Sequence, residues 1–106
     1  MEIINNVYFN KIQDEEIKQT IKSLYEDIKF LLQQYEEIMY DFSKHISGPQ
    51  RSRLVKIDNQ DILGEVIIIH TITEILRENN YIVINYIDNG SGFVRKIIVK
   101  KSIVQI

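Results

Sequence analysis

The stretch Ile12–Ile46, with the sequence IQDEEIKQTIKSLYEDIKFLLQQYEEIMYDFSKHI, organises the expected fold. Its apolar residues recur at alternating steps of four and three, which is the heptad spacing of a long amphipathic helix. These residues are Ile17, Ile21, Leu24, Ile28, Leu31, Tyr35, Ile38 and Phe42. Because an isolated amphipathic helix cannot bury its own stripe, the seam predicts a coiled-coil arm and a homo-oligomer, with a dimer favoured.

A third apolar position widens this seam. The e positions of the heptad hold Tyr25, Leu32, Met39 and Ile46. Three apolar positions in seven suit a bundle or a helix packed on a globular body, whereas a strict dimer seam is narrower. We expect the a and d positions to face a second helix and the e positions to contact the C-terminal body. The alternative is a core helix of a monomeric domain.

Sequence signals at both ends limit this helix. Asn10 is the expected N-cap, with Gln13 in the capping-box position three residues later. Ser47-Gly48-Pro49 is expected to stop the helix, and Pro49 is the only proline in the chain. We therefore expect a helical arm over residues 1–48 and a small β domain over residues 49–106.

Composition limits the class of protein. The chain has 106 residues, a net charge of -2 and no cysteine, which suits one compact domain without disulfides or a thiolate site. Neither a leader-like start nor an apolar run of membrane-spanning length is present. We expect a cytoplasmic protein that does not bind membranes.

The segment from residue 61 to residue 79 fits either a helix or a strand. Read as a helix, it has one apolar stripe. The stripe consists of Ile62, Val66, Ile69, Ile72 and Leu76. Read as a strand, its many β-branched residues suit a pleated surface, and Gly64 marks a bulge. We expect mainly strand, with the helix as the alternative.

The C-terminal part predicts a β-hairpin. Tyr81–Ile87 and Phe93–Lys100 are expected strands joined by the turn Asp88–Gly92. The expected register places Asn85 opposite Arg95, and Val83 opposite Ile97. Both hairpin faces carry apolar residues, so we expect both faces to be at least partly covered.

Two further strands are expected. Leu54–Ile57 is one of them, followed by a tight turn at Asp58-Asn59-Gln60. Ile103–Ile106 is expected to form a last short strand. The expected fold is therefore α+β, with the long heptad helix followed by a small antiparallel β-barrel or curled sheet. If residues 61–79 are helical, the order becomes α-β-α-β-β with a wing-like hairpin, as in winged-helix DNA-binding proteins.

Two stretches resemble small β-barrels. Val55–Val66 resembles the first two strands of Sm-like barrels, with an apolar strand, a turn and a glycine two residues before an apolar position. Val99–Ile106 is similar to the short turn and last strand of Sm-like and SH3-like barrels. The family's aspartate and asparagine would fall near His70 and Glu74, so the resemblance implies the barrel rather than its usual base-binding pocket.

Clustered basic residues carry the functional prediction. Residues 1–46 contain nine acids and five bases, a net of -4, whereas residues 47–106 contain eight bases and six acids, a net of +2. Seven bases are expected to converge where the first and last strands of the β domain meet, with Tyr81 and Tyr86 adding stacking surface. They are Arg51, Arg53, Lys56, Arg95, Lys96, Lys100 and Lys101. The simpler interpretation is solubilising charge on edge strands.

No catalytic constellation stands out. His45 and His70 have no partner at metal-ligand spacing, and no side chains supply a nucleophile, a base and an orienting group. We expect no enzyme, no metal and no cofactor. The favoured function is a non-enzymatic oligomer that binds DNA or RNA through the basic residues. The alternative is a protein-interaction adaptor or assembly module, of the kind a mobile element would encode.

Overall fold

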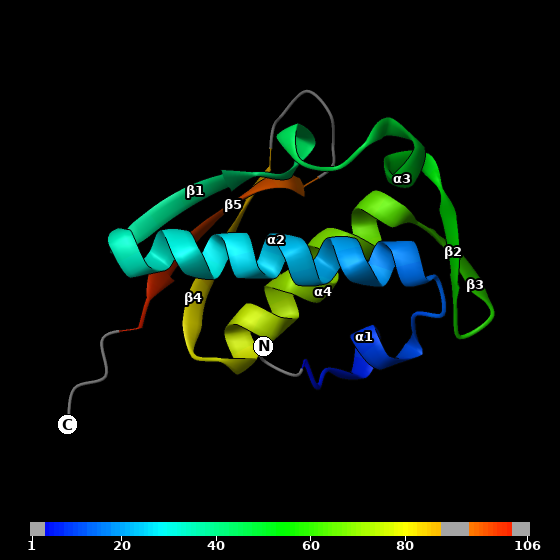
Figure 1. Cartoon of the computed structure of the whole chain (residues 1–106), viewed down its shortest axis with the longest axis horizontal. Helices are drawn as coiled ribbons and strands as arrows, with labels where there is room; N and C mark the ends of the chain where they lie inside the picture. Colours follow the sequence, from blue (N-terminus) through cyan, green and yellow to red (C-terminus); the bar gives the residue numbers. More distant parts are fainter. Residues whose placement is uncertain (1–3, 88–93, 103–106) are drawn as a thin grey trace.

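The computed structural model describes residues 4–87 and 94–102 (Figure 1). Their elements in chain order are α1 (Val7–Lys11), α2 (Glu15–Gln34), β1 (Glu37–Asp41), the 3₁₀ helix η1 (Phe42–Lys44), α3 (Gly48–Ser52), β2 (Leu54–Ile57), β3 (Gln60–Leu63), α4 (Gly64–Glu78), β4 (Tyr81–Ile87) and β5 (Val94–Lys101). The strands form an antiparallel sheet of order β1-β5-β4 and a separate β2-β3 hairpin. The fold is α+β as expected, but the small sheets do not close into a barrel.

The predicted long helix is present but shorter than expected. Helix α2 ends at Gln34, and Tyr35 is its C-cap with an extended backbone. The last heptad positions therefore lie outside α2, because the chain continues into β1 and the 3₁₀ helix η1. The predicted cap at Asn10 is also wrong. The Asp14 side chain caps α2 instead, accepting hydrogen bonds from the backbone N–H groups of Glu16 and Ile17.

The segment around the proline starts a helix rather than ending one. The Ser47 hydroxyl accepts a hydrogen bond from the backbone N–H of Gln50 and so caps α3. Pro49 lies in the first turn of α3, where a missing backbone N–H costs nothing. The turn between β2 and β3 is confirmed, with Asp58 and Asn59 at φ values of 50° and 66°, as a two-residue hairpin turn requires.

The prediction that residues 61–79 form mainly strand is wrong. Residues Gly64 to Glu78 form α4, so the helical alternative is correct for this segment. Gly64 is the first residue of this helix and not a bulge. A Cβ atom there would collide with the backbone carbonyl oxygen of Gln50. Glycine therefore lets α4 start in direct contact with α3.

The C-terminal hairpin is confirmed, with a different register. Asn85 pairs with Ile97 and Val83 with Val99, two residues away from the expected partners. The ladder is irregular between Tyr86, which pairs with Lys96, and Ile87, which pairs with Val94. The bulge at Arg95 accounts for one residue of this shift. A shift of two residues leaves each side chain on its predicted face. The predicted turn at residues 88–92 and the predicted last strand at residues 103–106 lie outside the described residues.

One core joins the helices to the three-stranded sheet. Figure 1 shows α2 lying across α4, with the β2-β3 hairpin beyond one end of α2. Side chains that are buried between these elements come from both ends of the chain. They include Ile17, Ile21 and Ile28 of α2, Ile68, Ile72 and Leu76 of α4, and Tyr40, Val83, Ile97 and Val99 of the sheet. The core is thus continuous across the boundary expected after residue 48. In the described ranges, no helix has the length and apolarity needed to cross a membrane.

Candidate functional site

Most residues of the heptad seam are buried in the core of the chain itself. Five of its eight residues are buried in the core, namely Ile17, Ile21, Leu24, Ile28 and Phe42. Leu31 and Ile38 are partly buried against that core, and Tyr35 is 57% exposed. Most of the residues proposed for the oligomer interface are therefore packed in the core of the same chain and are not available to a second copy in this structure.

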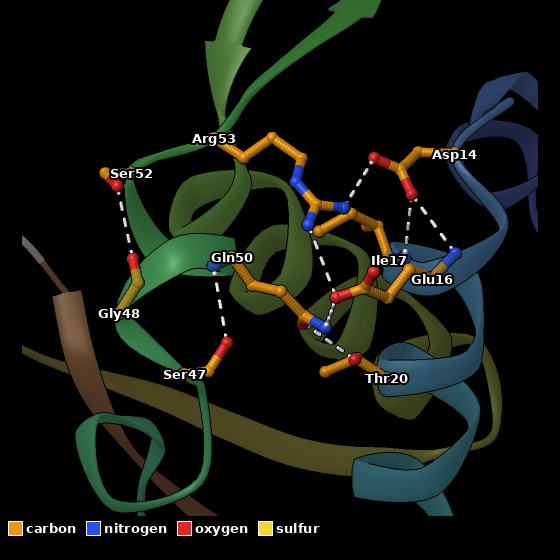
Figure 2. A network of polar contacts seen from close by, with 9 residues as sticks. All are labelled: Asp14, Glu16, Ile17, Thr20, Ser47, Gly48, Gln50, Ser52 and Arg53. Atoms are coloured by element: carbon orange, nitrogen blue, oxygen red, sulfur yellow. Dashed lines mark hydrogen bonds and ion pairs between the residues drawn. The ribbon is translucent and has the colours of Figure 1, made fainter.

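The first group of predicted basic residues is held by acidic and backbone partners. Arg53 forms ion pairs with Asp14 at 2.9 Å and Glu16 at 3.3 Å, as Figure 2 shows. Arg51 donates a hydrogen bond to the backbone oxygen of Ser43 at 3.0 Å. Lys56 is exposed on β2, across the ladder from Asp61.

The contacts of Arg53 belong to a larger network that fixes α3 and β2 to the start of α2 (Figure 2). The buried Gln50 amide donates to Glu16 at 2.8 Å and accepts from the Thr20 hydroxyl at 2.7 Å. Burial would raise the pKa of Asp14, but the Arg53 hydrogen bond and the backbone N–H of Ile17 hold that pKa below its usual value. The contacts of Arg53 in this network therefore give it a structural role.

The second group of basic residues lies on β5. Arg95, at the bulge, forms a 2.7 Å ion pair with the buried carboxylate of Glu65 on α4. Lys96 lies over the Tyr86 ring at 5.8 Å, and the Lys100 ammonium is 4.0 Å from a Glu37 carboxylate oxygen. Lys101, partly buried, donates its backbone N–H to the backbone oxygen of Glu36 at 3.2 Å.

The strands that carry the two basic groups belong to different sheets. Strand β2 pairs only with β3 in the described ranges, whereas β5 pairs with β1 and β4 in the other sheet. Tyr81 is partly buried against the core, and Tyr86 lies beside Lys96. Within the described residues, the expected meeting of strands therefore does not occur through pairing of β2, which carries Lys56, with β5 and its bases.

Several exposed apolar side chains share one face of the three-stranded sheet. We call outer face the side formed by alternate residues of β1, β5 and β4 that points away from α2 and α4. Its apolar side chains are Met39, Ile82, Ile84, Tyr86 and Ile98. Met39, Ile98 and Ile84 lie side by side in one row across the three strands. Met39 is 57% exposed and Ile84 is 51% exposed.

Charged residues flank this apolar row on both sides. One neighbouring row holds Glu37 on β1 and Lys100 on β5. The other holds Asp41 on β1 and Lys96 on β5. The Ser43 hydroxyl, which donates to Asp41 at 2.6 Å, holds the pKa of Asp41 below its usual value, and Lys96 adds to this effect. Each flanking row therefore has a negative charge on β1 and a positive charge on β5.

A hollow of about 410 Å³ adjoins the end of this face. Its lining residues are Glu36, Glu37, Ile82, Lys100, Lys101 and Ser102. The lining contains the same kinds of side chain as the outer face, since apolar Ile82 adjoins acidic and basic residues. The outer face is therefore both apolar at its centre and balanced in charge at its margin.

A second cavity, of about 330 Å³, lies on the inner side of the sheet against α4. Glu65, His70, Thr73, Glu74 and Arg77 are among its lining residues. The His70 ring packs edge-on against Tyr8, at a centroid distance of 4.5 Å. Over the described parts of the chain, no group of three histidine or acidic residues is placed to hold a metal ion.

The remaining histidine is also in an aromatic contact. The His45 ring stacks on Tyr40 with a centroid distance of 4.7 Å and an interplanar angle of 10°. Tyr40 itself donates its hydroxyl to Asp27 at 2.8 Å, and burial together with this contact raises its pKa. His45, the C-cap of η1, is thus an exposed residue whose ring stacks on the buried Tyr40.

Comparison with known proteins identifies no relative. No family model matches the chain, and neither a search of curated proteins nor a search of solved structures finds a significant match.

Proposed function

We propose that this chain is a non-enzymatic protein-interaction module that binds through the outer face. The observation that carries the proposal is the uncovered row of Met39, Ile98 and Ile84 across three hydrogen-bonded strands. Single exposed apolar residues are ordinary, but a contiguous apolar patch with a polar rim is typical of a contact surface. A cytoplasmic location remains part of this proposal.

The rigidity of the sheet supports this role. The strands that carry the row also carry Tyr40, Ile97 and Val99 on the inner face, where these side chains are buried. A docking partner therefore meets side chains whose backbone is already fixed by the core. Binding to such a surface does not require a loop to become ordered, so that free-energy cost is absent.

The contacts of the arginines give less support to nucleic-acid binding, which the sequence favoured. Arg53 and Arg95 each form an ion pair with a carboxylate of the same chain. A phosphate that binds either guanidinium has to compete with that carboxylate. Binding of DNA or RNA remains a separate prediction with its own measurement.

Site-specific photo-crosslinking tests the proposal. A benzophenone amino acid replaces Ile84 on the outer face, and a matched variant carries it at the exposed Ser23 of α2, on the opposite side of the sheet. After irradiation in cells that produce the chain, adducts are identified by mass spectrometry. We expect specific protein adducts from position 84 only, because an apolar face in contact with a partner excludes water from the probe. Adding Ile98→Asp should remove them, since it places a charge in the contact.

Equal adducts from positions 84 and 23 would contradict the proposal. Titration with duplex DNA and single-stranded RNA at several salt concentrations tests the nucleic-acid prediction. We expect binding too weak to define a salt dependence. A log-log slope near -0.9 per phosphate on duplex DNA, reduced by about two units in an Arg95→Ala/Lys96→Ala variant, would favour nucleic-acid binding instead.

A further inference from the structure

We propose that the partner of the outer face is a second copy of this chain, packed face to face on a twofold axis parallel to the strands and midway between β1 and β5. This inference rests on the proposed function, since it names the partner of the same surface. It follows from the distribution of charge on the face and from the register of the strands.

The register makes the face complementary to itself. Glu37 and Lys100 are direct partners in the ladder, and so are Asp41 and Lys96. A twofold axis in this position places β1 of one copy over β5 of the other. Each residue keeps its position along the strand direction, so residues that are partners in the ladder lie opposite each other. Each acid of one copy then faces a lysine of the other. Both flanking rows therefore pair acid with base in both directions.

The same axis places apolar side chains at the centre. Met39 and Ile98 are partners in the row between the two charged rows. Met39 of one copy therefore lies over Ile98 of the other and next to its Ile84. Aligned sheets pack about 10 Å apart, a distance that interdigitating Met and Ile side chains fill. An interface with an apolar centre and a charged rim is the usual arrangement at protein contacts.

The Glu37 and Lys100 side chains are only weakly engaged with each other within the chain. The Glu37 and Lys100 side chains are 58% and 47% exposed, and their ion pair within the chain is long, at 4.0 Å. Exposed pairs of this kind contribute little to folding. Turning them toward a second copy therefore costs the monomer little.

The size of the face sets the expected strength. This axis overlays β1 and β5 of the two copies, and two strands spaced by about 4.8 Å with five residues rising about 3.4 Å each cover roughly 10 by 17 Å. A contact of this size is smaller than the standard specific interface, so we expect only weak association, with a dissociation constant on the order of 100 μM. The dimer should be detectable at concentrations up to about 1 mM.

Charge reversal with rescue in a mixture tests this arrangement. Glu37→Lys brings the new ammonium over Lys100 of an identical copy, and Lys100→Glu brings the new carboxylate over Glu37 of an identical copy. Each variant alone should dimerise at least about tenfold more weakly, because two attractive contacts become repulsive. In an equimolar mixture, both pairs are attractive again, so the association should return. Glu26→Lys, an exposed charge reversal on α2, is the matched control and should dimerise normally.

Sedimentation equilibrium measures the association, and circular dichroism shows whether each variant is folded. Unmodified chain that stays monomeric at about 1 mM would overturn the inference. So would a dimer that Glu37→Lys does not weaken, or weakened variants that do not associate when mixed. If the probe at position 84 captures a different protein while the chain stays monomeric, the proposed function holds and this inference fails. If the probe captures no protein, both fail.

Discussion

The two faces of the three-stranded sheet are made by the same strands and yet have opposite surroundings. On the inner face, Tyr40, Ile97 and Val99 are buried under α2 and α4. On the outer face, Met39 and Ile84 are more than half exposed. Both faces carry apolar side chains, so apolar character alone does not distinguish the face that folds the chain from the face left for a partner. The covering helices make that difference.

The comparison is sharpest at two consecutive residues. Ile97 is fully buried on the inner face, and Ile98 lies at the centre of the outer face. We expect Ile97→Ala to lower the free energy of unfolding by about 2–5 kcal/mol, because it leaves a cavity in the core. Ile98→Ala should cost less than about 1 kcal/mol, because the residue is only partly buried. Urea unfolding at a protein concentration well below dimerisation measures both. Equal losses would show that the outer face is as important for folding as the inner face.

The second prediction concerns α4, the helix that covers the inner face. Gly64→Ala adds a methyl group against the backbone carbonyl oxygen and carbon of Gln50. Neither of these two atoms can move aside as the end of a flexible side chain can. The helix has to move, and we expect a loss of about 1–3 kcal/mol. Gly48→Ala is the control, since no atom lies within 4 Å of a Cβ there. It should be neutral or slightly stabilising. Similar results for the two glycines would contradict the close packing of α3 on α4.

The third prediction compares tyrosines on the two faces at high pH. Burial and the nearby Asp27 carboxylate raise the pKa of Tyr40 above its unfolded value near 10. The protonated Tyr40 therefore contributes fully to folding stability below about pH 10. As the pH rises above this value, the free energy of unfolding falls by up to about 1.4 kcal/mol per pH unit. Tyr40→Phe should remove this loss, whereas Tyr86→Phe on the outer face should not. Unfolding curves between about pH 8 and pH 11.5 provide the measurement. An unchanged loss in Tyr40→Phe would contradict the assignment.

The sequence predicts the helical part of the heptad stretch correctly up to Gln34. It fails beyond that point, because Tyr35, Ile38 and Phe42 keep the helical spacing by coincidence. β1 forms because it pairs with β5, and that partner lies some sixty residues away in the sequence. A local pattern does not contain such information, since strand formation depends on cross-strand neighbours.

The failure at α4 has a different cause. Its β-branched residues favour strands, but this helix is buried on most sides, as Ile67, Ile68 and Ile72 show. Burial outweighs intrinsic propensity in such a helix. The apolar stripe of residues 62–76 correctly indicates a helix.

Only part of the candidate site can be predicted from the sequence. The alternation of Ile82, Ile84 and Tyr86 predicts an apolar second face on the hairpin. Met39 does not stand out in the sequence, because it continues the heptad spacing of the long helix there. The basic residues were visible in the sequence, but their partners, such as Glu65 for Arg95, are set by tertiary structure.

Arg77 bears on what kind of assembly this chain can form. Its guanidinium donates a hydrogen bond at 3.0 Å to the backbone oxygen of Val83, on the outermost strand of the sheet. Addition of strands along an open edge has no natural end and leads to fibres, and a cation there is one way in which proteins oppose it. Association through faces on a twofold axis stops at two copies. A chain rich in isoleucine can thus expose an apolar sheet and still form a finite particle.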